Sequence, residues 1–104
     1  MICYDDHHAY GLESFEHPEI MQQLFFIKKT HREAGFPGQL VTQHDGTTNE
    51  EVLRMLIHRL KGLQAKFPCG ENVVAIYLLE AALETLERRT ADRKARGVEG
   101  KHLA

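Results

Sequence analysis

The fold is decided by one uninterrupted stretch, ENVVAIYLLEAALETLERRTADRKAR, which occupies residues 71–96. This stretch contains neither proline nor glycine, and it is rich in alanine, leucine, glutamate and arginine, which are strong helix formers. Its large apolar side chains recur every three or four residues, so they share one side of a helix. The pattern predicts a helix of roughly 25 residues and about 37 Å. The predicted seam consists of Ile76, Leu79, Leu83 and Leu86.

A second helix is predicted immediately upstream. Thr47 or Thr48 can cap its first turn, and Glu50 or Glu51 follows at the three-residue spacing of a capping box. The segment FPCG (residues 67–70) ends this helix in a short connection, so the two helices are expected to pack antiparallel. The upstream helix is only about 27 Å long, and the last turns of the longer helix should therefore overhang. Its apolar stripe is formed by Val52, Leu53, Leu56, Ile57, Leu60 and Leu63.

The first 46 residues carry weaker signals. Residues 1–17 show no clear period and predict an irregular arm. Pro18 suits the first position of a helix and Glu19 suits its positive end, so a short helix is predicted from Pro18 to near Gly35. Residues 39–46 are expected to form a loop around one short β-capable run, residues 39–42.

These elements predict an all-α protein with an N-terminal helix and a long antiparallel helical hairpin. Residues 1–46 would form the N-terminal arm, short helix and loop, and residues 47–104 a helical hairpin domain with a basic C-terminal end. Because a chain of 104 residues buries only a modest core, assembly as a homo-oligomer is expected.

The charge is unevenly distributed along the chain. The net charge of −2 divides into +4 for residues 88–104 and −6 for the rest. No run of 18 apolar residues predicts a membrane span, and residues 1–6 lack the basic and apolar regions of a signal peptide. The chain is therefore expected in the cytoplasm, where Cys3 and Cys69 would be reduced thiols.

The basic end contains Arg89, Arg93 and Arg96 at positions i, i+4 and i+7, which places three guanidinium groups on one helix face. Such groups bind phosphate oxygens with forked hydrogen bonds. Cations in the last turns of a helix also complement its dipole, so a solvated helix end is the alternative interpretation.

Two consecutive aromatic residues, Phe25 and Phe26, precede Lys28. On a helix, neighbouring side chains point about 100° apart, so one of the two rings is expected to meet another subunit or a planar ligand. A core or interface role and base stacking beside a lysine are both compatible with this pattern.

Catalytic and metal-binding patterns receive little support. The arm contains Asp5, Asp6, His7, His8 and His17, without the spacing that a zinc site requires. Ser14 has no nucleophile motif around it, and Cys69 has no paired histidine. We therefore expect a non-enzymatic protein with no metal and no cofactor.

The second half of the chain resembles a known family. The resemblance rests on FPCGEN (residues 67–72), LEAAL (79–83) and RRTADRKARGVEGKH (88–102), and it covers residues 47–104. These segments are similar to the small phage hairpin-domain proteins, which include cyclic-nucleotide sponges acting against the CBASS and Thoeris defence systems. The chain departs from that pattern at Gly70, where an arginine is expected, and at Thr85, where an aromatic residue is expected.

The resemblance implies a homo-oligomer, often a hexamer, that sequesters cyclic di- or trinucleotides or cyclic ADP-ribose isomers without cleaving them. It would act in the cytoplasm of an infected bacterium, with no membrane or nucleic-acid partner. The main alternative is a small helical phage adaptor or nucleic-acid-binding protein that uses the same basic face. The hypothesis assigns phosphates to Arg89, Arg93 and Arg96 with Lys28 assisting, base stacking to Phe25 or Phe26, and polar contacts to Thr90, Glu99 and His102.

Overall fold

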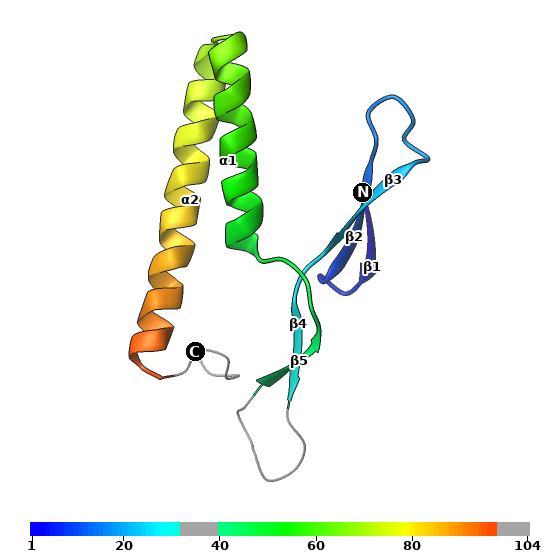
Figure 1. Cartoon of the computed structure of the whole chain (residues 1–104), viewed down its shortest axis with the longest axis vertical. Helices are drawn as coiled ribbons and strands as arrows, with labels where there is room; N and C mark the ends of the chain where they lie inside the picture. The colour runs from blue at the N-terminus through cyan, green and yellow to red at the C-terminus, as the bar shows by residue number, and fades with distance from the viewer. Residues whose placement is uncertain (32–39, 98–104) are drawn as a thin grey trace. The chain divides into compact units, whose positions relative to one another are not determined.

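A computed structural model describes residues 1–31 and 40–97. The chain forms two compact units, Met1–Thr48 and Asn49–Ala104. Figure 1 labels the strands of the first unit and the helices of the second.

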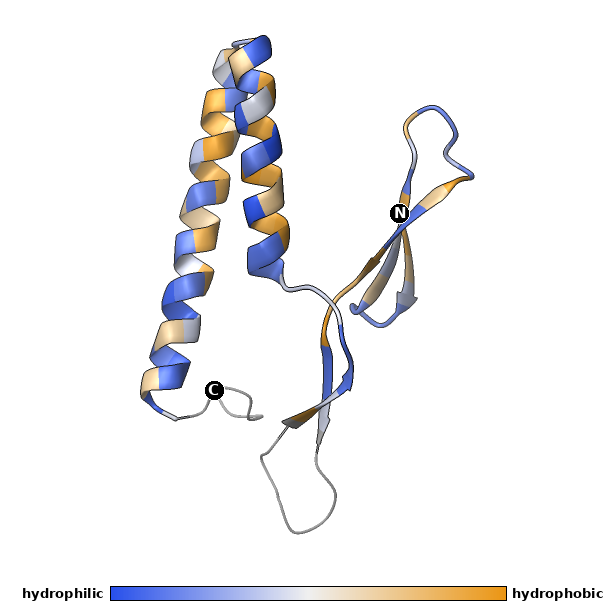
Figure 2. Ribbon diagram, viewed as in Figure 1, coloured by the Kyte–Doolittle hydropathy of each residue, from blue (hydrophilic) through white to orange (hydrophobic). Residues whose placement is uncertain are grey.

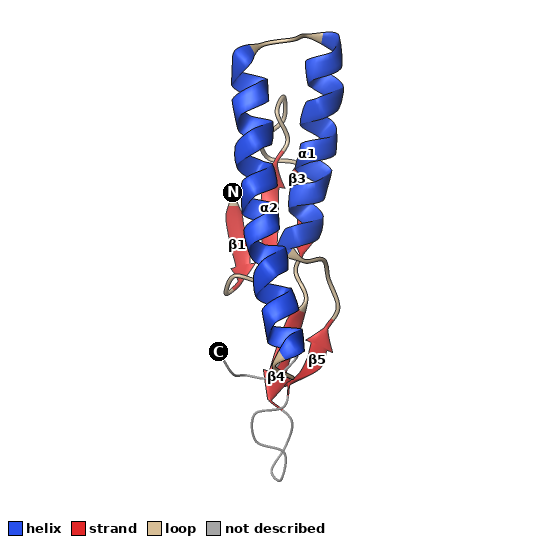
Figure 3. Ribbon diagram, turned by 90° about the vertical axis from the view of Figure 1, so that its left-hand side faces the viewer, coloured by secondary structure: helices blue, strands red, loops and turns tan. Residues whose placement is uncertain are grey.

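The second unit is a pair of helices, α1 (Asn49–Lys66) and α2 (Gly70–Ala95), which lie side by side in two perpendicular views (Figure 1, Figure 3). Helix α1 ends shortly before Pro68, because a proline cannot continue the helical hydrogen bonds. Gln64 Oε1 accepts a 3.0 Å hydrogen bond from the Cys69 amide across the connection. Gly97 ends α2 with a φ of 71°, the left-handed conformation that glycine adopts most readily. Both predicted hairpin helices are confirmed to within a few residues.

The first unit contains strands, which contradicts the predicted all-α fold. Strands β1 (Ile2–Asp5), β2 (Ala9–Glu13) and β3 (Met21–Phe25) form an antiparallel sheet in that order. Strands β4 (Lys28–His31) and β5 (Leu40–His44) form a second antiparallel ladder. The predicted irregular arm is therefore mostly strand, and residues 40–42 of the β-capable run belong to β5.

The helix predicted from Pro18 is wrong because Pro18 serves a turn. The Ile20 amide donates a 2.9 Å hydrogen bond to the His17 carbonyl, so Pro18 occupies the second position of a β-turn. Its fixed φ suits this position as well as the start of a helix. Ser14 closes the same loop, since its hydroxyl donates to the Ile20 carbonyl at 2.6 Å. Strand β3 then pairs with β2 from Met21 to Phe25.

Backbone hydrogen bonds join the two ladders of this unit. The Phe26 amide donates to the His8 carbonyl at 2.7 Å, the Ile27 amide to the Thr47 carbonyl at 2.9 Å, and the Thr47 amide to the Phe25 carbonyl at 2.8 Å. Gly46 lies against this crossing: a Cβ atom there would be 2.5 Å from the carbonyl carbon of Phe26. A side chain at residue 46 is therefore excluded by the backbone of residues 25–27.

The interior is small in both units. Of the residues that the structure describes, only Ala9, Gly11 and Ile57 are buried. Large apolar side chains remain exposed, and Figure 2 shows hydrophobic segments recurring along both helices. Within the described ranges, neither helix is both long and apolar enough to cross a membrane.

Candidate functional site

The register of the two helices determines which part of α2 extends beyond α1. Arg54 Nη2 lies 3.0 Å from Glu87 Oε1, and Lys61 Nζ lies 3.9 Å from Glu80 Oε2. Moving seven residues forward on α1 thus corresponds to moving seven residues back on α2, which is the signature of antiparallel packing. The same register brings Asn49, the first residue of α1, level with Asp92. At this end the overhang is limited to residues 93–95 of α2, about one helical turn, whereas Arg88 and Arg89 lie level with α1.

The composition of the α2 seam changes beside the first turn of α1. Ile76, Leu79, Leu83 and Leu86 are half-buried against α1, at spacings of three and four residues. The next two positions at this spacing are Thr90 and Arg93, which are also half-buried. The apolar seam therefore continues as a polar one at the level of the first turn of α1.

The guanidinium groups of the candidate site share one face of this helix end. At 100° per residue, Arg89, Arg93 and Arg96 fall within a sector of about 60°. Arg89 and Arg96 are exposed, and Arg96 Nη2 pairs with Asp92 Oδ2 at 3.0 Å. Even with Asp92 counted, this cluster retains a formal charge of about +2, which exceeds the roughly −0.5 of the helix C-terminus. The shared face of the three arginines follows from their spacing, and its affinity for phosphate groups stays a prediction.

Two predicted ligand contacts, Glu99 and His102, lie outside the described residues. Thr90 and the three arginines all belong to the second unit. Phe25, Phe26 and Lys28 belong to the first.

The two aromatic residues lie on a strand and its extension, not on a helix. Strand alternation separates their side chains: Phe25 is 51% exposed, whereas the Phe26 ring packs edge-on against Tyr10 with centroids 5.9 Å apart. Partial desolvation raises the pKa of the Tyr10 phenol. Phe25 is therefore the better candidate of the two for contact with a planar ligand.

Lys28 is already engaged by a carboxylate. Its Nζ lies 3.0 and 3.1 Å from the two Asp5 oxygens, and His44 Nε2 lies 3.4 Å from Asp5 Oδ2. The hydrogen bond from Lys28 holds the pKa of the Asp5 carboxyl below its ordinary value, against the opposing effect of desolvation. The Asp5–Lys28–His44 cluster joins β1 to the β4–β5 ladder. Sequence reasoning missed it because Asp5 and Lys28 are far apart along the chain.

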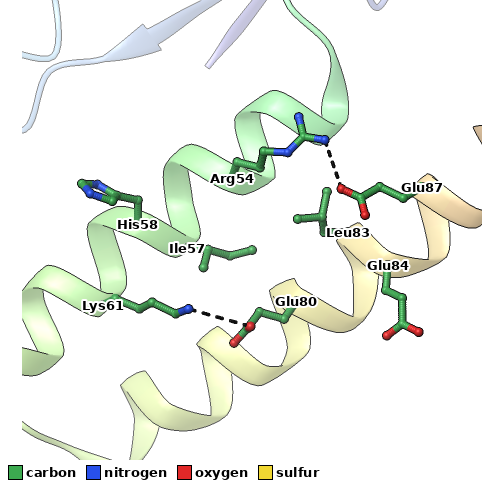
Figure 4. Close-up of a pocket in the computed structure, with 8 residues that line it drawn as sticks. All are labelled: Arg54, Ile57, His58, Lys61, Glu80, Leu83, Glu84 and Glu87. Atoms are coloured by element: carbon green, nitrogen blue, oxygen red, sulfur yellow. Dashed lines mark hydrogen bonds and ion pairs between the residues drawn. The ribbon is translucent and has the colours of Figure 1, made fainter.

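A groove between α1 and α2 was also missed by sequence reasoning (Figure 4). Its volume is about 380 Å³. Ile57 and Leu83 provide its apolar lining, and the ion pairs Arg54–Glu87 and Lys61–Glu80 cross between the helices (Figure 4). His58 and Glu84 also line it. None of the predicted ligand-binding residues lines this groove.

Within residues 1–31 and 40–97, no three His, Cys, Asp or Glu side chains gather closely enough to hold a metal ion. Cys3 and Cys69 are exposed free thiols.

The fold and site define a helix pair with a cationic end, joined to a small β unit, and no model of a protein family matches the chain. One curated protein is similar to it, Thoeris anti-defense 1 of Bacillus phage SBSphiJ7, at 49% identity over 65 residues. This alignment covers 60% of the chain and 46% of the phage protein, so the chain spans about half the length of its relative. The resemblance to phage anti-defence proteins is thereby confirmed.

Proposed function

We propose that this chain is a non-catalytic phage anti-defence protein that binds and sequesters a cyclic nucleotide messenger in the infected bacterium. The observation that carries the proposal is its 49% identity to a phage protein named for its action against the Thoeris defence system. The ligands considered are cyclic di- and trinucleotides and cyclic ADP-ribose isomers, which share phosphate groups and flat bases.

The cationic end of α2 supports the phosphate half of this recognition. Arg89, Arg93 and Arg96 present their guanidinium groups from one face, and forked donors suit phosphate oxygens. Arg93 and Thr90 continue the half-buried seam, so part of the face lies in a less hydrated setting than an exposed helix end. Electrostatic attraction is stronger where water is partly excluded.

The open setting of the cationic helix end supports a site shared between copies. Ligand pockets enclose most of a small molecule, whereas an exposed helix end encloses little by itself. Self-association, with six copies as the resemblance implies, would close protein around the ligand and supply an aromatic such as Phe25 for stacking.

Titration calorimetry with one cyclic dinucleotide, one cyclic trinucleotide and one cyclic ADP-ribose isomer tests the proposal. Arg89→Ala should weaken binding of the preferred ligand by about tenfold or more, because a charge-assisted hydrogen bond contributes roughly 1.5–3 kcal/mol. Arg54→Ala is the matched control, since Arg54 is an arginine of the same unit that pairs with Glu87. Binding of none of the three ligands would refute the proposal.

A binding measurement with duplex DNA distinguishes the sponge from the alternative, a nucleic-acid-binding adaptor. Duplex DNA binding through the same cations would weaken steeply with salt and depend on duplex length. A sponge instead saturates at a fixed ratio of small ligand to protein. Tight, length-dependent duplex binding without binding of any cyclic nucleotide would favour the adaptor interpretation.

A further inference from the structure

Helix α2 carries a second stripe at regular spacing, away from the seam that packs on α1. Its positions are spaced three, four, three, four and three residues apart, which is the spacing of a coiled-coil seam. It is offset by five residues, or about 140°, from the seam of Ile76, Leu79, Leu83 and Leu86. We call it the outer stripe, and it consists of Glu71, Val74, Leu78, Ala81, Thr85 and Arg88.

The outer stripe is exposed along its whole length. Val74 is 57% and Leu78 is 60% exposed, and the flanking residues Val73 and Tyr77 are 53% and 71% exposed. Ala81 and Thr85 are small and exposed as well, and the Thr85 hydroxyl donates a 2.9 Å hydrogen bond to the Ala81 carbonyl. Neighbouring large apolar side chains on a helix surface are typical of a contact with another protein surface.

We propose that the outer stripe is the surface on which a second copy of this chain packs, with the two α2 helices antiparallel about a two-fold axis. The inference rests on the self-association that forms part of the proposed function, and it assigns that association to specific residues. A two-fold axis places the same stripe on both sides of the contact.

The stripe is complementary to itself in this orientation. Because its spacings read the same in both directions, an axis midway between Leu78 and Ala81 places every stripe position opposite another stripe position. The largest apolar side chain then meets the smallest, because Leu78 faces Ala81 of the second copy, while Val74 faces Thr85 of the second copy, which has a similar size. The pairing of Leu78 with Ala81 lets the two helices approach closely near the axis.

The charges at the two ends of the stripe match in the same arrangement. Glu71 of each copy lies opposite Arg88 of the other, so the dimer gains two ion pairs. Within the described part of the chain, neither Glu71 nor Arg88 makes an ion pair of its own. A parallel arrangement would instead bring Glu71 against Glu71 and Arg88 against Arg88, which is unfavourable.

The sparse interior explains why this surface needs a partner. With few buried residues in the described ranges, a chain of this size gains stability by covering apolar surface in an assembly. The stripe spans 17 residue steps, or about 26 Å of helix. An antiparallel contact of this length would convert two helix pairs into a layer of four helices.

The first test is Leu78→Arg, measured by sedimentation equilibrium of the whole protein, with circular dichroism as the check on folding. This change places one unpaired charge per copy at the centre of the contact, and it should raise the dimer dissociation constant by about 100-fold or more. Met55→Arg is the matched control, because Met55 is an apolar α1 residue that is 55% exposed and lies outside the stripe. It should leave the dissociation constant within about twofold.

The second test fixes the orientation. Glu71→Arg and Arg88→Glu should each weaken the dimer by about tenfold, and the double variant should restore it, because opposite charges again face one another. Rescue in the double variant is expected only for the antiparallel pairing.

Several outcomes would overturn the inference. A wild-type chain that stays monomeric, equal dissociation by Met55→Arg, or no rescue in the double variant would each exclude the antiparallel stripe contact. A Leu78→Arg variant that dimerises as tightly as the wild type would exclude it as well. The interface and the proposed function can fail independently. If the wild-type protein dimerises but binds no cyclic nucleotide, the interface stands and the proposed function is refuted.

Discussion

Gly46→Ala and Gly62→Ala are the same chemical change with opposite expected effects on stability. At Gly46 a Cβ atom would lie 2.5, 2.6 and 2.7 Å from the Phe26 carbonyl carbon, the Phe25 carbonyl oxygen and the Ile27 amide nitrogen. All three are backbone atoms, so the clash is relieved only if the crossing of residues 25–27 and 46–47 opens. At Gly62, within α1, nothing lies within 4 Å of the added methyl group.

The magnitude at Gly46 follows from the bonds at the crossing. Overpacking costs about 1–3 kcal/mol, and loss of the Ile27–Thr47 and Thr47–Phe25 hydrogen bonds, at 2.9 and 2.8 Å, adds about 1 kcal/mol each. The expected loss is about 3–5 kcal/mol. A unit of 48 residues has a total stability of roughly 2–7 kcal/mol. Gly46→Ala should therefore unfold the N-terminal unit partly or completely.

Amide hydrogen exchange resolved by residue is the assay, because it reports the local free energy of opening. In Gly46→Ala, protection of the Phe26, Ile27 and Thr47 amides should fall while protection within α1 and α2 persists. In Gly62→Ala, the free energy of opening of the amides within the helix pair should rise by about 0.5–1 kcal/mol, because alanine restricts the unfolded chain and favours a helix. Unchanged exchange at the three crossing amides in Gly46→Ala would refute the reasoning.

Three further predictions concern other parts of the chain. Asp5→Asn should destabilise the N-terminal unit at neutral pH. Because a depressed carboxyl pKa stabilises the fold at pH values above its ordinary pKa of 3.8, the difference in stability from the wild type should shrink as the pH falls through the folded-state pKa of Asp5. Denaturant melts across the acid range measure this difference in stability. Ile57→Ala removes the buried side chain of α1 and should cost the helix pair about 2–3 kcal/mol by thermal melting, at the low end for isoleucine because the groove beside it is open. A loss below about 0.5 kcal/mol would place the core elsewhere. Glu87→Gln breaks an exposed ion pair with Arg54 and should cost less than about 1 kcal/mol, with the effect fading at high salt.

The two helices could be predicted from the sequence because their signals are long and mutually consistent. Residues 71–96 repeat the helical period many times without a breaker, and the connection at Pro68 leaves only one way to pack. The overhang and the common face of Arg89, Arg93 and Arg96 then follow from helix geometry alone.

The strands could not be predicted for three physical reasons. They are four or five residues long, so their period of two is sampled only briefly. Their side chains are mostly exposed on both faces, which removes the alternation of apolar and polar residues that marks a half-buried strand. Pro18 and Glu19 suit a turn as well as a helix start, and only the pairing of β3 with β2 decides between them.

The pairing of Asp5 with Lys28 and His44 depends on that same missed sheet. Once β1 and the β4–β5 ladder are known, the carboxylate and the two basic side chains come together. The groove at Ile57 and Leu83, in contrast, follows from the register of the helices and could have been derived from the two predicted seams.

The central claim is that this chain holds a cyclic nucleotide intact, and one measurement tests it most directly. The protein is saturated with the preferred ligand from the calorimetric panel, freed of excess ligand and heat-denatured, and the released molecule is identified by mass spectrometry. The account predicts recovery of the intact cyclic ligand at a fixed ratio to protein. Recovery of a linear product would show an enzyme instead, and recovery of no nucleotide would contradict sequestration altogether.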